Sequence, residues 1–200
     1  HARTGNLKAA ETAWKDGKAL VSRARGKKNA SPKYLQQLNI EWDRLDHNFY
    51  ESRGRWNEAE TALRGAIETR KNASFGSEDA SWMPSRQKQL ASILMKQGRL
   101  VEAEIMARGA LLDSLANIGR NNSTTADVVR ILATILHRQG RFDDAEILGR
   151  TAIDIQTKAG MSPSSRKIAQ ARRFLVSALV SNKKWQGALE VVEQARADLT

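Results

Sequence analysis

The residues that could carry out acid–base or metal chemistry are scattered along this sequence instead of being grouped. Its three histidines are His1, His47 and His137. Glu51 follows His47 by four residues, but one such pair does not make a metal site, and the HExxH motif of zinc enzymes is absent. We therefore expect His47 to be a structural residue on the inward face of a helix.

The acidic pairs and the nucleophiles form no catalytic pattern either. Asp143 and Asp144 are adjacent, so their carboxylates point in different directions, and they fall where a helix begins and negative charge is favourable. No GxSxG elbow, phosphate-binding loop or dinucleotide-binding glycine motif occurs. The lack of cysteine excludes disulfides, thiolate metal ligands and a cysteine nucleophile. The sequence thus predicts no catalytic residue, no metal site and no cofactor, and we do not expect an enzyme.

The composition is typical of a folded helical protein. Of the 200 residues, 40% are hydrophobic and only three are proline, which favours helix and argues against wholesale disorder. No stretch approaches eighteen consecutive apolar residues, so we expect no membrane-spanning helix. The start, His1-Ala2-Arg3, is interpreted as a trimmed or processed end. The compartment stays open, because both the cytosol and a bacterial periplasm tolerate cysteine-free proteins.

The net charge of +11 is concentrated at one end of the chain. Residues 1–33 contain nine Lys or Arg against Glu11 and Asp16, a balance of +7, and the rest contributes +4 with both signs interspersed. A basic end can attract phosphate groups, and Trp14 and Trp82 remain available as base-stacking side chains. A solvated helix end followed by a loop is the simpler interpretation of the same charges.

A segment of the form glycine, basic residue, large apolar residue, two variable residues, alanine and glutamate recurs along the chain. It begins at Gly54, Gly98 and Gly140, and variants of it begin at Gly5 and Lys183. The large apolar residues Trp56, Leu100, Phe142 and Trp185 are spaced 44, 42 and 43 residues apart. Regular spacing with matching side chains indicates a repeat protein.

Each position of the repeated segment has a structural explanation. The glycine can take the left-handed conformation that ends a helix, and the large apolar residue is expected to fill the crease between two antiparallel helices. Alanine recurs within each segment and again seven residues later, so that small residues share one helix face and allow close approach. The apolar spacing of three and four before each glycine predicts a first helix. Polar loops are expected near residues 26–33, 72–81, 118–124 and 160–165.

The pattern Leu132-Ala133…Leu136…Gly140-Arg141-Phe142…Ala145…Ala152 resembles the tetratricopeptide repeat, in the long-helix variant of kinesin light chains. The resemblance implies an all-α fold: an α-solenoid of antiparallel helix hairpins forming a right-handed superhelix. We expect a single array over residues 1–200, with the second helix of a partial repeat at 4–25. Full repeats are predicted over 33–71, 82–117, 125–159 and 165–199.

The two ends of the array are expected to lack covering repeats. Residues 4–25 form half a hairpin, which cannot bury its own apolar face, so we expect the array to continue upstream in a longer protein. Val191, Val192 and Ala195 lie on a last helix that no further repeat covers. Oligomers through these exposed ends are possible on this interpretation.

The resemblance also implies where a ligand binds, because first helices line a concave peptide-binding groove in tetratricopeptide arrays. Carried over position by position, the groove residues are Lys88, Ser92, Met95, Lys96, Asp127, Arg130, Thr134, His137, Arg138, Arg173 and Ser177. The middle of this set is basic, which favours an acidic peptide or a terminal carboxylate.

Two classes of function remain open. The first is a protein-interaction scaffold that binds a peptide or protein segment, as part of a larger multidomain protein. The second is a nucleic-acid-binding solenoid that uses the basic end. The charge is local and does not form a continuous stripe, which favours the protein ligand and makes nucleic acid the weaker alternative.

Overall fold

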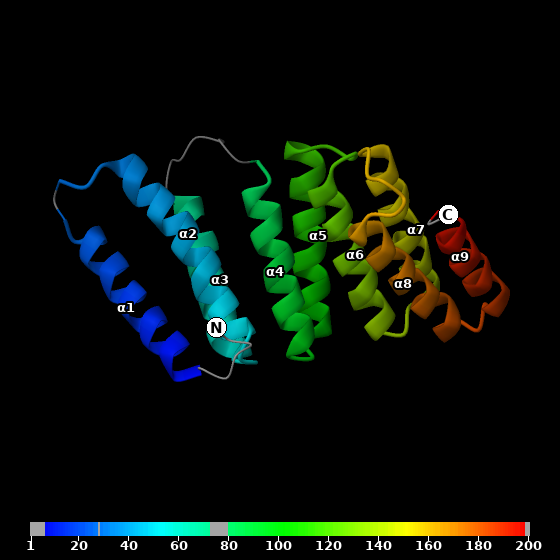
Figure 1. Cartoon of the computed structure of the whole chain (residues 1–200), viewed down its shortest axis with the longest axis horizontal. Coiled ribbons are helices and arrows are strands. Elements are labelled where there is room, and N and C mark those ends of the chain that lie inside the picture. The colour runs from blue at the N-terminus through cyan, green and yellow to red at the C-terminus, as the bar shows by residue number, and fades with distance from the viewer. Residues whose placement is uncertain (1–6, 28, 73–79, 199–200) are drawn as a thin grey trace. The chain divides into compact units, whose positions relative to one another are not determined.

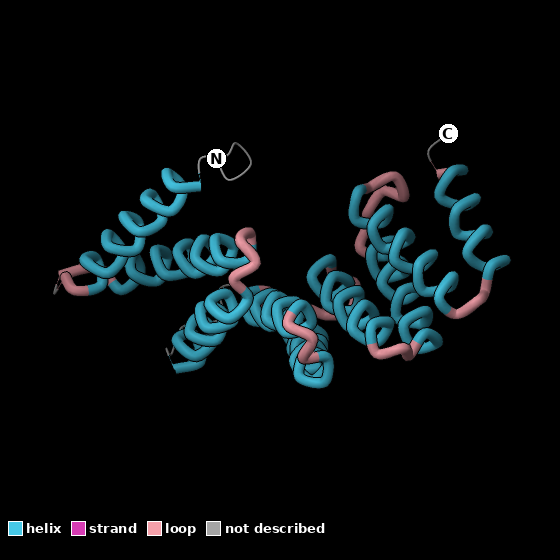
Figure 2. The backbone as a smooth tube through the Cα atoms, turned by 90° about the horizontal axis from the view of Figure 1, so that it is seen from below, coloured by secondary structure: helices cyan, strands magenta, loops and turns pink. Residues whose placement is uncertain are grey.

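The computed structural model describes residues 7–27, 29–72 and 80–198, and within these ranges the chain forms nine α-helices and no strand (Figure 1 and Figure 2). The helices are α1 (Leu7–Arg25), α2 (Pro32–Glu51), α3 (Trp56–Asn72), α4 (Trp82–Lys96), α5 (Leu100–Asn117), α6 (Ser123–Arg138), α7 (Phe142–Lys158), α8 (Arg166–Ser181) and α9 (Trp185–Ala197). The all-α prediction is confirmed. The expected loop over 72–81 lies largely outside the described residues.

The helices group into two compact units, residues 1–74 and residues 75–200. In unit 1, α2 packs against α1 on one side and α3 on the other. Its buried residues include Val21, Tyr50 and Leu63, together with His47, which is fully buried as expected of a structural residue. The predicted repeat boundaries and the single array remain predictions.

Unit 2 consists of three antiparallel hairpins, α4–α5, α6–α7 and α8–α9. The first helices α4 and α6 pack against each other, as do α6 and α8, and each second helix also packs against the first helix that follows it. Leucines and isoleucines of the first helices fill the core, among them Leu90, Leu132, Leu136, Ile168 and Leu179. Unit 2 therefore places its first helices beside one another, which is the arrangement a shared binding face requires.

Glycine turns close the hairpins as the sequence predicts. Gly98 and Gly140 have φ of 80° and 79°, and the residue after each donates its backbone N–H to a carbonyl in the last turn of the first helix. Lys183 occupies the equivalent place in the last hairpin and takes the same conformation, with φ of 59°. A residue with a Cβ is strained at this positive φ, so the last turn contains a lysine where glycine would fit without strain.

The alanines that recur in α5 and α7 are buried, as the expected close packing of hairpin helices requires. Ala103, Ala145 and Ala152 are completely buried. The large apolar residue of the repeat is half-buried in three cases, but Trp185 is 62% exposed. The expectation that Trp185 fills a crease is therefore wrong, because no described helix lies beyond α9 to cover it.

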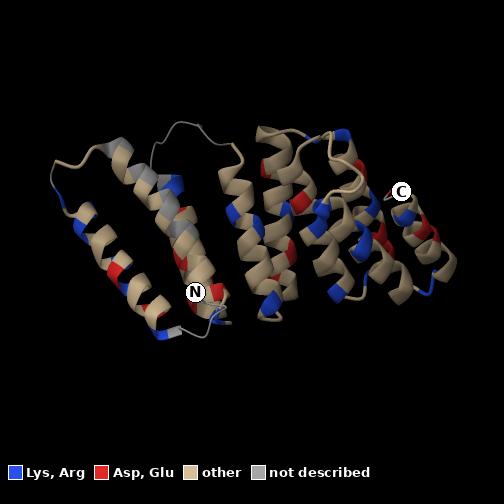
Figure 3. Ribbon diagram, in the orientation of Figure 1, with Lys and Arg blue, Asp and Glu red and all other residues tan. Residues whose placement is uncertain are grey.

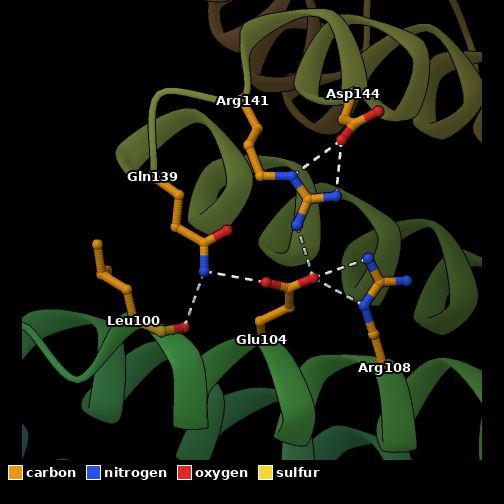
Figure 4. Close-up of polar contacts among 6 residues, drawn as sticks. All are labelled: Leu100, Glu104, Arg108, Gln139, Arg141 and Asp144. Carbon is orange, nitrogen blue, oxygen red and sulfur yellow. Dashed lines mark hydrogen bonds and ion pairs between the residues drawn. The ribbon is translucent and has the colours of Figure 1, made fainter.

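In unit 2, the glutamates that end the repeated segments beginning at Gly98 and Gly140 each join one repeat to the next, and Figure 4 shows the first of these junctions. Glu104 of α5 accepts hydrogen bonds from Gln139 and Arg141 of the next turn, at 3.0 Å each, and from Arg108 on its own helix at 2.8 Å. One repeat later, Glu146 accepts from Lys184 at 2.9 Å and from Arg150 at 3.0 Å. We call these two groups the Glu104 and Glu146 clusters.

The same contacts set the ionisation of the two carboxylates. Burial raises the pKa of Glu104, but hydrogen bonds from Arg108, Gln139 and Arg141 outweigh it and the pKa lies below its ordinary value. The hydrogen bond from Lys184 is the main cause of a lowered pKa at Glu146. Both glutamates are therefore held in the charged form, which stabilises the junctions between repeats.

Replacing Ala103 or Ala145 by leucine should overpack the hairpin contact and lower the free energy of unfolding by about 1–3 kcal/mol in denaturant melts. Ala116 lies exposed on the same helix as Ala103. Ala116→Leu is the matched control and should change stability by less than about 0.5 kcal/mol. Equal effects at all three sites would contradict the hairpin register.

Lys183→Gly should raise the free energy of unfolding by about 0.5–1 kcal/mol, because glycine adopts positive φ without steric cost. The gain is smaller than the full strain, since glycine also increases the entropy of the unfolded chain. Lys183→Ala keeps the Cβ and should give no gain in the same thermal melts. A stabilisation as large in the alanine variant would mean that removing the lysine charge is the cause.

Glu104→Gln should lower the free energy of unfolding by about 1 kcal/mol at pH 7, since a charge-assisted junction is lost. Because the pKa of Glu104 is lowered in the folded state, its contribution is present above about pH 4.3, the ordinary value for glutamate, and disappears as the pH falls through the folded value. Denaturant melts of the variant and the wild type should therefore converge as the pH falls below the lowered pKa of Glu104 in the folded state. Glu102→Gln removes a half-exposed surface pair on the same helix and should cost less at every pH.

Candidate peptide-binding surface

The residues predicted to line a groove come from equivalent turns of α4, α6 and α8. Lys88, Arg130 and Arg173 are equivalent, as are Ser92, Thr134 and Ser177. We call the whole predicted set the first-helix face. Because α4 packs against α6 and α6 packs against α8, these positions lie on neighbouring helices of unit 2.

Contacts between neighbouring first helices support this arrangement. Lys88 of α4 lies 3.7 Å from the Asp127 carboxylate of α6, and Arg138 donates to the backbone carbonyl of Met95 at 3.3 Å. Further along, the His137 ring nitrogen lies 2.9 Å from the Ser181 hydroxyl of α8. Some residues of the first-helix face therefore also form contacts between neighbouring repeats.

The predicted residues differ in how much they are exposed. Lys96, Arg138, Arg173 and Ser177 are exposed, and Lys88, Ser92, Asp127, Arg130, Thr134 and His137 are half-buried. Met95 is only 6% exposed, so its side chain belongs to the core of α4 and is not available to a ligand. The interpretation of Met95 as a groove side chain is therefore wrong. Helix α4 turns this position inward, towards the core of unit 2.

Basic and acidic residues are interspersed along the helices of unit 2 (Figure 3), and Asp127 changes the electrostatics of the face. It forms ion pairs with Lys88 and with Lys167, the latter at 3.2 Å, so it joins all three first helices. Burial lowers the pKa of Lys88, and the charges of Arg130 and Lys167 add to this, while Asp127 opposes it. Much of the positive charge at this end of the face is thus used within the protein.

Arg130 and Arg173 are the cations that keep the most capacity for a ligand. Within the described residues neither guanidinium makes a hydrogen bond or an ion pair, and they occupy equivalent turns of neighbouring helices. A guanidinium presents several N–H donors in a planar fork that suits a carboxylate. The face therefore offers two carboxylate-binding groups in succession, with the hydroxyls of Thr134 and Ser177 one turn further along.

His137 packs between helices on this face. Its ring packs edge-on against Phe142 at 5.3 Å and against Phe174 at 6.0 Å, in addition to its contact with Ser181. The imidazole thus fills the junction between the second and third hairpins of unit 2. Thr134 likewise satisfies its hydroxyl locally, by donating to the Arg130 carbonyl at 2.8 Å.

Two features of the face escaped the sequence analysis. Lys167 was not among the predicted residues, although it donates to both Asp127 and Ser123. A hollow of about 320 Å³ also lies between α8 and α9, where Arg173 stands beside Val176, Val191 and Val192. The apolar last helix was the only signal for the hollow, and nothing in the repeat pattern indicates Lys167.

The two tryptophans left available for base stacking are occupied. Trp14 stacks on Phe49 with ring centroids 4.5 Å apart and donates its indole N–H to Asp46 at 2.9 Å. Trp82 is only 5% exposed. Neither ring is a platform for a nucleobase, so the nucleic-acid interpretation loses its aromatic support.

No group of histidine and carboxylate side chains that could hold a metal ion occurs in the parts of the chain that the structure describes. A search of those parts for a helix long and apolar enough to cross a membrane found none.

Comparison with known proteins agrees with the repeat pattern. The family model described as tetratricopeptide repeat matches residues 85–158, which span α4 to α7. These residues are thus similar to tetratricopeptide repeats. The match begins three residues after the first helix of unit 2 begins and ends with α7. A search of curated proteins found no match.

Solved structures extend the likeness to nearly the whole chain. The crystal structure of BtubC (BKLC) from P. vanneervenii aligns with a TM-score of 0.76 at 18% identity, covering 98% of this chain and 74% of that chain. A Podosopora anserina protein described as a putative kinesin light chain with nearly identical TPR-like repeats aligns with a TM-score of 0.70 at 20% identity, covering 99% and 89%. A point variant of that protein gives a TM-score of 0.71 at 21% identity, covering 98% and 88%. The chain therefore has a tetratricopeptide-type solenoid fold.

Proposed function

We propose that unit 2 binds a peptide segment of another protein along its first-helix face. A tetratricopeptide fold suggests a protein-interaction scaffold, and proteins with these repeats are generally not enzymes. The observation that carries the proposal is that Arg130 and Arg173 occupy equivalent turns of α6 and α8, and that neither guanidinium group has a partner among the described residues. The ligand side chain that suits this pair is a carboxylate.

The charges of the face favour an acidic segment held at one end of it. Where α4, the start of α6 and the start of α8 meet, Asp127 is already paired with Lys88 and Lys167 and offsets one of their two positive charges, so an acidic ligand gains less there. From Arg130 towards Arg173 the positive charge has no internal partner among the described residues. An extended peptide with an aspartate or glutamate in this region, or with its terminal carboxylate there, would form charge-assisted hydrogen bonds.

The proposal can be tested with random twelve-residue peptides displayed on phage and selected on the full chain. We expect the selected peptides to be enriched in Asp and Glu. Synthetic copies should bind the double variant Arg130→Glu with Arg173→Glu at least about tenfold more weakly in fluorescence anisotropy, because a repulsive charge replaces an attractive one. The affinity for the wild type should also fall with added salt, since half-exposed charges are screened.

A matched control carries the same change of charge away from this face. Arg120→Glu with Arg196→Glu alters two exposed residues of the α5–α6 loop and of α9. This variant should bind the selected peptides as the wild type does, within about twofold. Selection of peptides without acidic residues, or equal loss of affinity in both double variants, would contradict the proposal. Lys88 is left unchanged, because Lys88→Glu would set a second carboxylate beside Asp127.

A further inference from the structure

The second helix α5 presents apolar side chains to solvent along one line. Val101, Ile105, Leu112 and Leu115 are 69%, 65%, 68% and 44% exposed. With Arg108 they are spaced by four, three, four and three residues, so all five fall on one stripe of the helix. We call these five residues the α5 seam. This spacing is that of the core positions of a coiled coil, which pack against a second helix.

The fold itself does not require apolar residues at these positions. The equivalent residues of α3 are Asn57, Thr61, Arg64, Glu68 and Lys71, and those of α7 are Asp143, Ile147, Arg150, Asp154 and Thr157. Those of α3 are exposed without exception, and those of α7 are exposed apart from Asp154, whose side chain is still 42% exposed. Four of the five on α7, and all five on α3, are polar.

Neighbouring repeats do not cover such a stripe. Helix α7 has first helices packed on both sides of it, α6 and α8, and its equivalent positions still face solvent. The apolar seam of α5 is therefore not the face by which one repeat stacks on another. A row of large apolar residues that the fold neither needs nor buries indicates a site for a further partner.

We propose that the α5 seam binds an amphipathic helix of another protein, with an acidic side chain opposite Arg108. The seam runs from residue 101 to residue 115, about 21 Å of helix, which four turns of a partner helix would cover. Apolar side chains at matching positions of the partner would pack against Val101, Ile105, Leu112 and Leu115. This surface lies on a second helix, so it is separate from the first-helix face.

Arg108 determines the charge that the partner needs. Its Nε and Nη2 atoms contact Glu104 at 2.8 Å and 2.7 Å. The third nitrogen, Nη1, points away from Glu104 (Figure 4) and forms no hydrogen bond within the described part of the chain. This nitrogen can donate to an incoming carboxylate at the middle of the seam, where the flanking apolar contacts exclude water and strengthen the bond.

The same residue argues against a second copy of this chain as the occupant. Two α5 helices packed antiparallel about the middle of the seam would place Arg108 against Arg108. Each Arg108 already shares Glu104 with Gln139 and Arg141, so that carboxylate is poorly placed to neutralise a second guanidinium. A helix that brings its own carboxylate avoids this repulsion.

A synthetic helix of about eighteen residues can test the proposal. It carries leucine at four core positions with the spacing of the seam and glutamate at the central one, and a side-chain staple on its outer face keeps it helical and monomeric. We expect the full chain to bind it in fluorescence anisotropy. Replacing the central glutamate by lysine should weaken binding by about tenfold, because the lysine meets Arg108.

Two variants locate the binding on the chain. Ile105→Ser with Leu112→Ser should weaken the glutamate-centred helix at least about tenfold, because two central apolar contacts are lost. Both side chains face solvent, so the circular dichroism and melting temperature should stay close to those of the wild type. The matched control is Ile147→Ser, which alters the equivalent of Ile105 on α7 and should leave the affinity unchanged.

Four results would overturn the proposal. They are no binding by the wild-type chain, equal binding by the seam variant, equal binding of the lysine-centred helix, and a wild-type dimer in sedimentation equilibrium that the seam variant loses. The last would assign the seam to self-association. The variant Arg130→Glu with Arg173→Glu should still bind the stapled helix, so that failure at the first-helix face and failure at the seam are distinguishable.

Discussion

A hairpin of two amphipathic helices cannot bury its apolar residues by itself, and this constraint governs unit 2. Ala103 and Ala145 are completely buried in their hairpins, and the second helices α5 and α7 each also pack against the first helix of the next hairpin. The apolar contact is not directional, so something must hold neighbouring repeats in register. The Glu104 and Glu146 clusters do this, because each carboxylate receives hydrogen bonds from the turn of the following repeat. Every surface of unit 2 depends on that stacking.

The architecture was predictable from the sequence because it rests on local chemistry that recurs. The glycine turns, the paired alanines and the apolar spacing of the first helices each have one physical explanation, and their recurrence after 42 to 44 residues makes chance agreement improbable. The turn at Lys183 shows the strength of this inference, since the chain takes a left-handed conformation there even without glycine. The period of the repeat, more than any single residue, identified the fold.

The details of the candidate site were less predictable, because they depend on contacts between helices. Met95 and His137 occupy equivalent positions of α4 and α6, yet the first is buried and the second bridges to Ser181. Asp127 was expected on the face, but its pairing with Lys88 and Lys167 depends on how α4, α6 and α8 are rotated relative to one another. A pattern along one helix carries no information about that rotation. Buried positions vary between repeats for the same reason, as Gly149 shows, since Phe174 of the next repeat comes within 3.2 Å of where its Cβ would lie.

Positions where one repeat has a different type of residue from its neighbours, which we call departures from the repeat, carry information about function when they are exposed. A buried departure is compensated by a neighbour, as Phe174 compensates for Gly149, and it therefore concerns packing. An exposed departure has no such neighbour. Arg130 and Arg173 lack the carboxylate that Asp127 supplies to Lys88, and the α5 seam has leucine where α7 has Asp154. An unpaired guanidinium on a packed face does not stabilise the folded protein more than another polar residue at that position would. The same holds for a row of exposed apolar residues. Both departures are therefore more simply explained by ligands than by the fold, and they lie on different helices, the two arginines on the first helices α6 and α8 and the seam on the second helix α5.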